Sequence, residues 1–387
     1  MSNEPVEGAG DESAPFAFAA PQISVETPPK VSHSRGLDTS LVIEQVTFGG
    51  KGLGRLQSGK VCFVPRVIPG ERVECRITRE KSKHAEADLV RILEASPDRV
   101  RPKCPVFGTC GGCSYQHISY DRQLAIKTLQ VEDALRRLGS ITAPVVRPAI
   151  PSPQQYGYRN RISVHVRAGK VGFFGAKSHR VVDVAECPIA SELVNAELQA
   201  LRDSQPRDGE YSLREPSDYR GFRQVNSSAG ELMKEAVASL SAPGGELLVD
   251  AYCGAGFFAH HLREQYTQVV GIEWSEDAVR AARERRGANE IYLLGDVEQH
   301  LTAALQSGPA EATTVLIDPP AEGIGSGVVG HLLERAPSRI IYVSCNPATL
   351  ARDIKSLSSK YAFQEVRPID MFPQTAEIEA IALLHRI

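Results

Sequence analysis

Residues 246–257 read Glu-Leu-Leu-Val-Asp-Ala-Tyr-Cys-Gly-Ala-Gly-Phe, a short apolar run that ends in an acidic residue and a glycine-rich turn. This pattern predicts a buried strand followed by a turn whose backbone can approach a ligand closely. Four further apolar runs follow, at residues 269–273, 290–294, 314–318 and 339–343. Helical segments separate them. Strands that alternate with helices predict an α/β fold with a doubly wound, Rossmann-like parallel sheet.

Acidic side chains mark the ends of these strands. Asp250, Glu273 and Asp318 stand at strand ends, and Asp296 follows the third strand. Ligands of such sheets bind beyond the carboxyl ends of the strands, where Glu273 can accept two ribose hydroxyls and Asp296 can reach an adenine amino group. The ordered set predicts a site for S-adenosylmethionine. The glycine turn alone would also fit nicotinamide cofactors, and the alternative is a similar sheet with solvated acidic caps.

The segment Ser344-Cys345-Asn346-Pro347 directly follows the fifth strand and places Cys345 at the same sheet edge. A thiolate can add to carbon 6 of uracil, which makes carbon 5 nucleophilic enough to attack a methyl sulfonium. A carboxylate must then remove the proton from carbon 5. Glu377 and Glu379 are the candidates, and in a strand they would point to the same face. The alternative for Cys345 is a buried strand-end cysteine.

The first part of the chain has a different character. Residues 1–37 are rich in Pro, Ala, Glu and Ser and predict a disordered tail. Short β-prone runs, broken by glycine-rich turns at 49–54 and 69–70, predict a small β-barrel at 38–96. A helix expected at 121–138 and strand-like alternation at 155–190 predict a mixed α+β central domain. The resulting division is a tail at 1–37, a barrel at 38–96, a central domain at 97–220 and a methyltransferase domain at 221–387.

Composition and charge narrow the class of protein. Hydrophobic residues make up 42% and charged residues 24% of the 387 residues, which is ordinary for a globular chain. No apolar run reaches 18 residues and the start is acidic, so we expect no membrane-spanning helix, no secretory signal and a cytoplasmic location. Residues 41–170 carry 22 Lys and Arg against 11 Asp and Glu, a surplus of 11 in a chain of net charge −3. This surplus favours a polyanionic partner, although a solvated basic face is the alternative.

Three of the eight cysteines lie close together. Cys104, Cys110 and Cys113 have the spacing C-x5-C-x2-C, and Cys187, which precedes a proline, is a fourth candidate. Four thiolates can hold zinc or a [4Fe–4S] cluster, and the spacing leaves both possibilities open. Reduced free thiols are the alternative. A disulfide framework is not expected, since such scaffolds are short and cysteine-dense.

From residue 38 to the end, these motifs together resemble the RNA uracil-5-methyltransferase family. They are most similar to its iron–sulfur branch, which methylates uracils in 23S ribosomal RNA. The resemblance implies a TRAM-type RNA-binding barrel, a [4Fe–4S] cluster rather than zinc, Cys345 as the nucleophile and Glu379 rather than Glu377 as the general base. The residues that it implies for the cofactor S-adenosyl-L-methionine are Gln224, Tyr252, Glu273, Asp296 and Asp318. Those that it implies for the cluster are Cys104, Cys110, Cys113 and Cys187.

The chain departs from the family pattern at a few positions. Ala321 follows Asp318-Pro319-Pro320 where the family has a basic residue, Phe257 replaces an Asn, and Gln374 and Glu377 replace His. We expect a monomeric enzyme that methylates a uridine, in ribosomal more readily than in transfer RNA. The alternatives are a tRNA uracil-5-methyltransferase, a cytosine-5-methyltransferase, and a non-catalytic RNA-binding factor with a degenerate methyltransferase domain, which Ala321 and Phe257 would favour.

Overall fold

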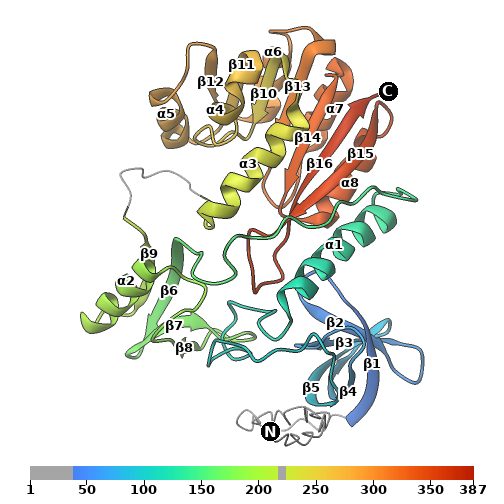
Figure 1. Cartoon of the computed structure of the whole chain (residues 1–387), viewed down its shortest axis with the longest axis vertical. Coiled ribbons are helices and arrows are strands. Elements are labelled where there is room, and N and C mark those ends of the chain that lie inside the picture. Colours follow the sequence, from blue (N-terminus) through green and yellow to red (C-terminus); the bar gives the residue numbers. More distant parts are fainter. Residues whose placement is uncertain (1–37, 217–223) are drawn as a thin grey trace, which may run out of the picture. The chain divides into compact units, whose positions relative to one another are not determined.

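The computed structural model describes residues 38–216 and 224–387 (Figure 1). The predicted tail at 1–37 and the predicted boundary at 220/221 lie outside these residues. The division of the chain into domains therefore stays a prediction. Within the described ranges, no helix is both long enough and apolar enough to cross a membrane.

The first strands close into the predicted barrel. They are β1 (Asp38–Val46), β2 (Lys51–Arg55), β3 (Val61–Pro65), β4 (Arg72–Glu80) and β5 (His84–Glu94), in the spatial order β1-β2-β3-β5-β4. Alternate side chains such as Ile43, Val64 and Val73 fill the interior.

The prediction of a turn over residues 49–54 was wrong, because residues 51–55 form β2 between β1 and β3. Glycine is needed there for close packing rather than for turning. A Cβ on Gly52 would lie 2.2 Å from a Val67 methyl group, and one on Gly54 would lie 2.4 Å from the Val42 carbonyl oxygen. The chain turns instead just before this strand, where Gly49 and Gly50 both have positive φ.

The middle of the chain contains α1 (Tyr120–Arg137), β6 (Arg161–Arg167), β7 (Lys170–Phe174), β8 (Val181–Asp183), α2 (Glu192–Asp203) and β9 (Gly209–Arg214). The predicted helix at 121–138 is thus confirmed within one residue at each end. The four strands form an antiparallel sheet in the order β8-β7-β6-β9. Val164 and Leu213 of this sheet pack against Val194 and Leu198 of α2, which lies along one face (Figure 1).

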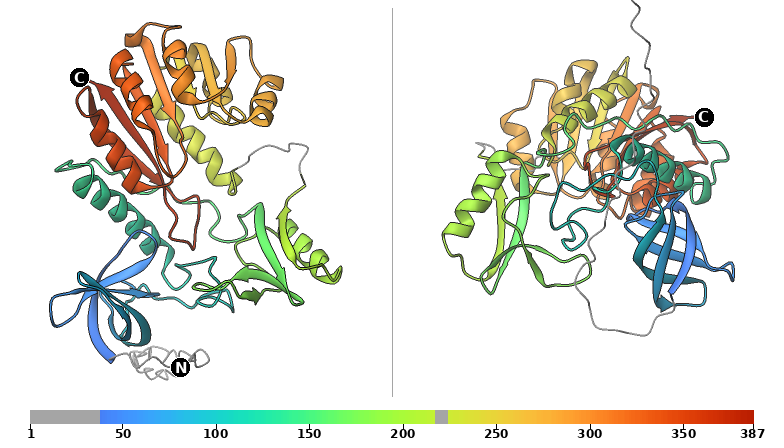
Figure 2. Two further views of the ribbon diagram at one scale, coloured as in Figure 1. Left: turned by 180° about the vertical axis from the view of Figure 1, so that it is seen from behind. Right: turned by 60° about the horizontal axis from the view of Figure 1, so that its bottom comes forward.

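The last part contains α3 (Ser227–Ser241), β10 (Gly245–Ala251), α4 (Ala259–Leu262), η1 (Arg263–Gln265), β11 (Tyr266–Glu273), α5 (Glu276–Glu284), β12 (Glu290–Leu294), α6 (Val297–Leu305), η2 (Ala310–Ala312), β13 (Thr313–Ile317), α7 (Ser326–Arg335), β14 (Arg339–Ser344), α8 (Pro347–Leu357), β15 (Tyr361–Ile369) and β16 (Glu379–Arg386). The five predicted strands are all present and pair in parallel. Successive residues of β10 enter two apolar clusters, Leu247 and Val249 with α6, α7 and α8, and Leu248 with α3, α4 and α5. Helices therefore cover both faces, as a doubly wound sheet requires (Figure 2).

Two further strands complete this sheet. Its order is β12-β11-β10-β13-β14-β16-β15, and β16 is antiparallel to both of its neighbours. The sheet is therefore mixed at one edge. This arrangement brings the start of β16 next to the end of β14, because Ala380 pairs with Ser344.

Candidate functional site

The turn after β10 is built around a buried carboxyl group. Asp250 is fully buried, and its Oδ2 accepts a hydrogen bond of 3.0 Å from the Ala259 backbone N–H, whereas its Oδ1 has no partner within the described structure. Burial raises the pKa of Asp250 well above its ordinary value. Within the turn, Gly256 has a φ of +80°, and a Cβ there would lie 2.6 Å from Nε2 of His260. The turn therefore requires glycine at this position.

The carboxylate of Glu273 spans the same turn. It ends β11 and accepts hydrogen bonds from the backbone N–H groups of Gly254, at 3.0 Å, and Ser275, at 2.9 Å. Two amide donors fix its position, so the carboxylate is oriented before any ligand arrives. Asp296 lies beyond the next strand, where it is exposed and caps α6 by accepting from the Glu298 N–H at 2.8 Å.

Two other predicted cofactor residues flank this arrangement. Tyr252 has a φ of +67°, and burial, reinforced by the charge of Asp296, raises the pKa of its hydroxyl to about 12. Gln224 lies just before α3, and its backbone oxygen accepts a hydrogen bond of 2.8 Å from Nδ2 of Asn160. Phe222 and Arg223, which precede Gln224 in the chain, fall outside the described residues.

Cys345 sits between the end of β14 and the start of α8. Asn346 caps α8 by accepting from the Ala348 N–H at 3.0 Å, and Pro347 occupies the first turn, where its missing N–H costs nothing. Because Asn346 and Pro347 begin α8, Cys345 is held in the short connection between the end of β14 and this helix. Burial, and then the charges of Glu379 and Asp318, raise the pKa of Cys345 to about 11.

Carboxyl groups surround this thiol. Glu379 begins β16, beside the end of β14. Its pKa is raised well above the ordinary range, by burial first and then by Asp318 and Glu377. Burial alone raises the pKa of Asp318 to about 7. Each of these three groups therefore keeps its proton to a higher pH than it would in water.

The expectation that Glu377 and Glu379 share one strand face was wrong. Glu377 lies before the strand begins and is exposed, and its backbone N–H donates to Oγ1 of Thr375. In the preceding segment, the carbonyl oxygens of residues 371–374 accept hydrogen bonds from distant parts of the chain and do not pair with a strand. Of the two, Glu379 alone belongs to β16, where it pairs with Ile369 of β15, and the next residue, Ala380, pairs with Ser344 of β14.

The segment before Glu379, residues 370–378, is held by contacts with α1 that the sequence analysis did not predict. Nζ of Lys127, on α1, lies 2.6 Å from Oδ1 of Asp370, and both side chains are buried. Gln123, one helical turn earlier, exchanges two 3.0 Å hydrogen bonds with Gln374. The available sequence signal was a lysine among the apolar residues of a helix, next to Ile126.

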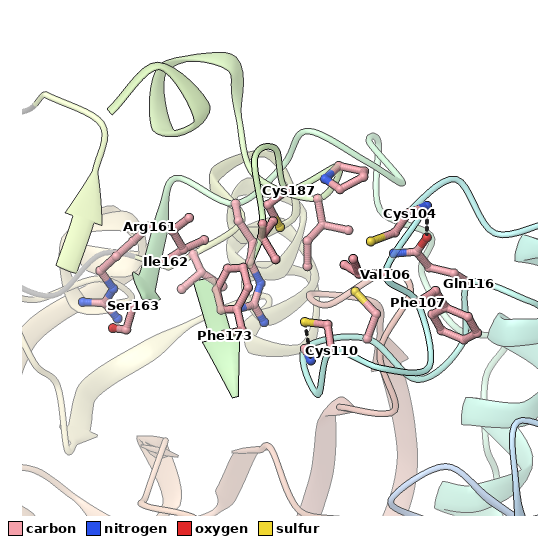
Figure 3. A pocket seen from close by; sticks show the side chains of 17 residues that line it. Cys104, Val106, Phe107, Cys110, Gln116, Arg161, Ile162, Ser163, Phe173 and Cys187 are labelled. Atoms are coloured by element: carbon pink, nitrogen blue, oxygen red, sulfur yellow. Dashed lines mark hydrogen bonds between the residues drawn. The ribbon is translucent and has the colours of Figure 1, made fainter. Parts of the chain in front are cut away.

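The four predicted metal ligands line one cavity of about 310 Å³ (Figure 3). The thiols of Cys104, Cys110, Cys113 and Cys187 are all free. Burial, and then the neighbouring thiols of Cys187, Cys110 and Cys104, raise the pKa of Cys113 to about 12. Across residues 38–216 and 224–387, no three His, Cys, Asp or Glu side chains are arranged to hold a metal ion. The donor set, four sulfur atoms around one cavity, nonetheless suits a soft metal or a cluster.

Comparisons with known families match the barrel region and the last part of the chain separately. Residues 203–387 match the profile of the family described as tRNA (uracil-5-)-methyltransferase, and residues 41–90 match that of the TRAM domain. An uncharacterized RNA methyltransferase of Bdellovibrio bacteriovorus is 32% identical over 90% of this chain and 95% of its own length. A tRNA (uracil(54)-C(5))-methyltransferase of Schizosaccharomyces pombe is 30% identical over 92% of this chain and 80% of its own length.

A solved structure is similar over most of the chain. The tRNA (uracil-54, C5)-methyltransferase of Pyrococcus abyssi, in complex with S-adenosyl-L-homocysteine, superposes with a TM-score of 0.68 at 24% identity. The match covers 89% of this chain and 100% of that one. It supports the fold described above, including the barrel and the doubly wound sheet.

Proposed function

The chain belongs to the RNA uracil-5-methyltransferase family, and from this premise we propose that it methylates carbon 5 of a uridine in ribosomal RNA, with Cys345 as nucleophile and Glu379 as base. It is an S-adenosylmethionine-dependent RNA methyltransferase with a TRAM barrel. The observation that carries the proposed mechanism is the pairing of β14 with β16, which puts the thiol-bearing turn next to the carboxyl group of Glu379.

The proposed sequence of steps needs one nucleophile and one base. The thiolate of Cys345 adds to carbon 6 of the uracil, and the electron pair of the 5,6 double bond moves toward oxygen 4. S-adenosylmethionine, when bound, supplies a methyl group to carbon 5. Glu379 then removes the proton from carbon 5, the double bond reforms, and the carbon–sulfur bond to Cys345 breaks. A carboxyl group with a raised pKa is the stronger base once it is ionised, which suits this role.

The remaining predicted residues have roles in holding the methyl donor. We assign the ribose hydroxyls to Glu273, whose carboxylate is already oriented by two amides, and the adenine to Asp296. Gln224, Tyr252 and Asp318 complete the proposed site. Asp318 raises the pKa of both Cys345 and Glu379, so its charge is felt where the reaction would occur.

We further propose that Cys104, Cys110, Cys113 and Cys187 hold a [4Fe–4S] cluster, with zinc as the alternative. Its role would be structural, because none of the residues that line the cysteine cavity belongs to β14, β16 or the turns beside them. The cysteine segment is joined directly to residues 370–378, since the N–H groups of Ser114 and Tyr115 donate to the Gln374 carbonyl oxygen at 3.1 and 2.9 Å. Protein purified without oxygen should absorb visible light if the cluster is present, and zinc would leave it colourless.

Ribosomal and transfer RNA are separated by one experiment. The S. pombe and P. abyssi proteins are named for a tRNA uridine, which favours transfer RNA as the second candidate. Purified protein is incubated with methyl-labelled S-adenosylmethionine and with RNA from cells that lack this gene, fractionated into ribosomal and transfer RNA. Label in 5-methyluridine of the ribosomal fraction supports the proposal. Label confined to the transfer RNA supports the second candidate, and label in 5-methylcytidine contradicts both.

The nucleophile is tested with the same assay. Cys345→Ala should abolish incorporation while the affinity for RNA stays unchanged. Cys62→Ala, which alters a buried cysteine of the barrel core, is the matched control and should keep full activity. RNA that contains 5-fluorouridine should form a covalent complex with the wild-type protein and none with Cys345→Ala. Methyl incorporation by Cys345→Ala would overturn the assignment.

A further inference from the structure

The sheet formed by β8, β7, β6 and β9 has a face that α2 does not cover. Val164 and Leu213 point toward α2, so the residues next to them along each strand point to the other side. We call that side the open face. Its basic, aromatic and hydroxyl side chains are Arg161, Ser163, His165, Arg167, Lys170, Phe174, Ser212 and Arg214. Its acidic side chains are Glu210 and Asp183, and Asp183 is paired with Arg202 at 2.8 Å.

Like charges lie opposite each other across the strands of the open face. Arg161 of β6 pairs in register with Arg214 of β9, and Arg167 pairs with Lys170 of β7. None of these four cations forms an ion pair with a described carboxylate, although Lys170 lies close enough to Asp183 to help lower the pKa of that carboxyl group. Like charges in directly opposite positions destabilise a sheet. Two such pairs on one face are best explained by a polyanion that binds there and neutralises them.

An aromatic cluster lies between these two cation pairs. The rings of His165 and Phe174 are stacked, with centroids 3.8 Å apart and planes inclined by 15°. The ring of His179 meets Phe174 edge-on at 5.3 Å. His165 and Phe174 are half-buried, so part of each ring is accessible. Accessible flat rings between cations are the surface on which unpaired nucleotide bases stack.

The position of the open face ties it to the reaction site. Arg161 and Arg214 stand at the end of the sheet that adjoins Asn160, and Nδ2 of Asn160 donates to the backbone oxygen of Gln224. Arg161 and Ser163 extend from β6 in Figure 3, at the rim of the cysteine cavity. A strand of RNA that crosses the open face therefore reaches the segment assigned to the methyl donor.

We propose that the open face binds a single-stranded stretch of the substrate RNA that flanks the target uridine. Its bases stack on His165 and Phe174, and its phosphates lie at the Arg161–Arg214 and Arg167–Lys170 pairs. Duplex RNA does not fit this face as well, because its bases are already stacked inside the helix. The inference rests on RNA being the substrate of the proposed function, and it adds the surface and the mode of recognition.

The full chain is tested with a fluorescein-labelled oligouridine of 12 nucleotides, by anisotropy at several salt concentrations. Phe174→Leu should weaken binding about tenfold, as expected for the loss of one stacked base. The double variant Arg161→Gln/Arg214→Gln should lower the slope of log affinity against log salt by about 1.4, which corresponds to two phosphate contacts. The control Arg136→Gln/Arg137→Gln removes the same charge from the exposed end of α1 and should change neither quantity.

Photocrosslinking with a 5-iodouridine-substituted oligonucleotide locates the contact. Crosslinked peptides should fall within residues 161–182, and the yield should drop in Phe174→Leu. If Phe174→Leu does not fold, His165→Ala replaces it in both measurements. Crosslinks confined to the barrel, wild-type affinity in the Phe174, His165 and double-arginine variants, or equal competition by a 12-base-pair duplex would each overturn the proposal.

The methylation assay separates this proposal from the proposed function. In bulk RNA, the variants of the open face should raise KM and leave kcat unchanged. Unchanged KM in enzymatically active variants refutes the open face alone. Lack of methyl transfer by the wild-type protein refutes the proposed function, and the crosslinks then still decide whether the open face binds RNA.

Discussion

The raised pKa of Cys345 predicts slow alkylation of its thiol, which chemical modification can measure. A thiol with an ordinary pKa of 9.0 is about 10% ionised at pH 8, whereas one with a pKa of about 11 is about 0.1% ionised. Alkylating agents react with the thiolate alone. Cys345 in the free protein should therefore react with iodoacetamide about a hundredfold more slowly at pH 8 than an exposed cysteine of a short peptide.

The pH profile gives the sharper measurement. Because the raised pKa lies above the accessible range, the rate should rise tenfold for each pH unit from 7 to 9.5, with no levelling. The rate is followed by mass spectrometry of the peptide that contains Cys345, with Cys345→Ala as the background. Glu379→Gln should speed the reaction by less than tenfold, since burial is a larger cause of the shift than the charge of Glu379. A profile that levels off at or below pH 9 would refute the reasoning.

Three substitutions test other parts of the structure. Lys127→Met should lower the free energy of unfolding by about 3–5 kcal/mol in urea titrations, because it leaves the buried carboxylate of Asp370 unpaired. The control Arg137→Gln, on the same helix, should lower it by less than about 1 kcal/mol. Equal effects of the two substitutions would contradict the burial argument. Gly256→Ala should weaken binding of S-adenosylhomocysteine about tenfold or more in calorimetry, because residue 256 has a φ of +80° and a Cβ there would clash with His260. Unchanged affinity would show that this turn does not belong to the cofactor site. Asn346→Ala should lower the free energy of unfolding by about 1 kcal/mol, because the N-terminal cap of α8 is lost, and thermal unfolding measures this change. Ser358→Ala, at the other end of that helix, is the control. Equal stability of the two variants would argue against the cap.

Local sequence patterns carried most of the information on the doubly wound sheet. The inner parallel strands are buried on both faces and so appear as continuous apolar runs, which is why 339–343 could be recognised. The edge strand at 290–294 keeps an apolar sequence although Ile291 and Leu294 are exposed. The acidic residues at the strand ends then fell at one edge as a consequence of parallel pairing. β15 and β16 were not recognised as part of this sheet, since a strand's own residues do not reveal which neighbour it joins or in which direction.

Contacts between distant parts of the chain could not be predicted in this way. The carbonyl oxygens of residues 371–374 accept hydrogen bonds from Asn226, Lys127, Tyr158 and the Ser114–Tyr115 backbone, and the nearest of these in sequence is 145 residues away. No periodicity or motif records such partners. The same limit applies to Glu377, because its local pattern did not show that the strand begins only at Glu379.

These long-range contacts hold the segment that precedes Glu379, the proposed base. The predicted boundary at 220/221 would separate residues 370–378 from Lys127, Tyr158 and the segment after Cys113. A fragment cut there would lose the hydrogen bonds that Lys127 and Tyr158 donate to Asp370 and to the carbonyl oxygens of Phe372 and Pro373. The segment that leads into Glu379 is thus stabilised by residues on the other side of that boundary. The proposed catalytic edge is a property of the whole chain, although its nucleophile, base and cofactor residues nearly all lie in the last part.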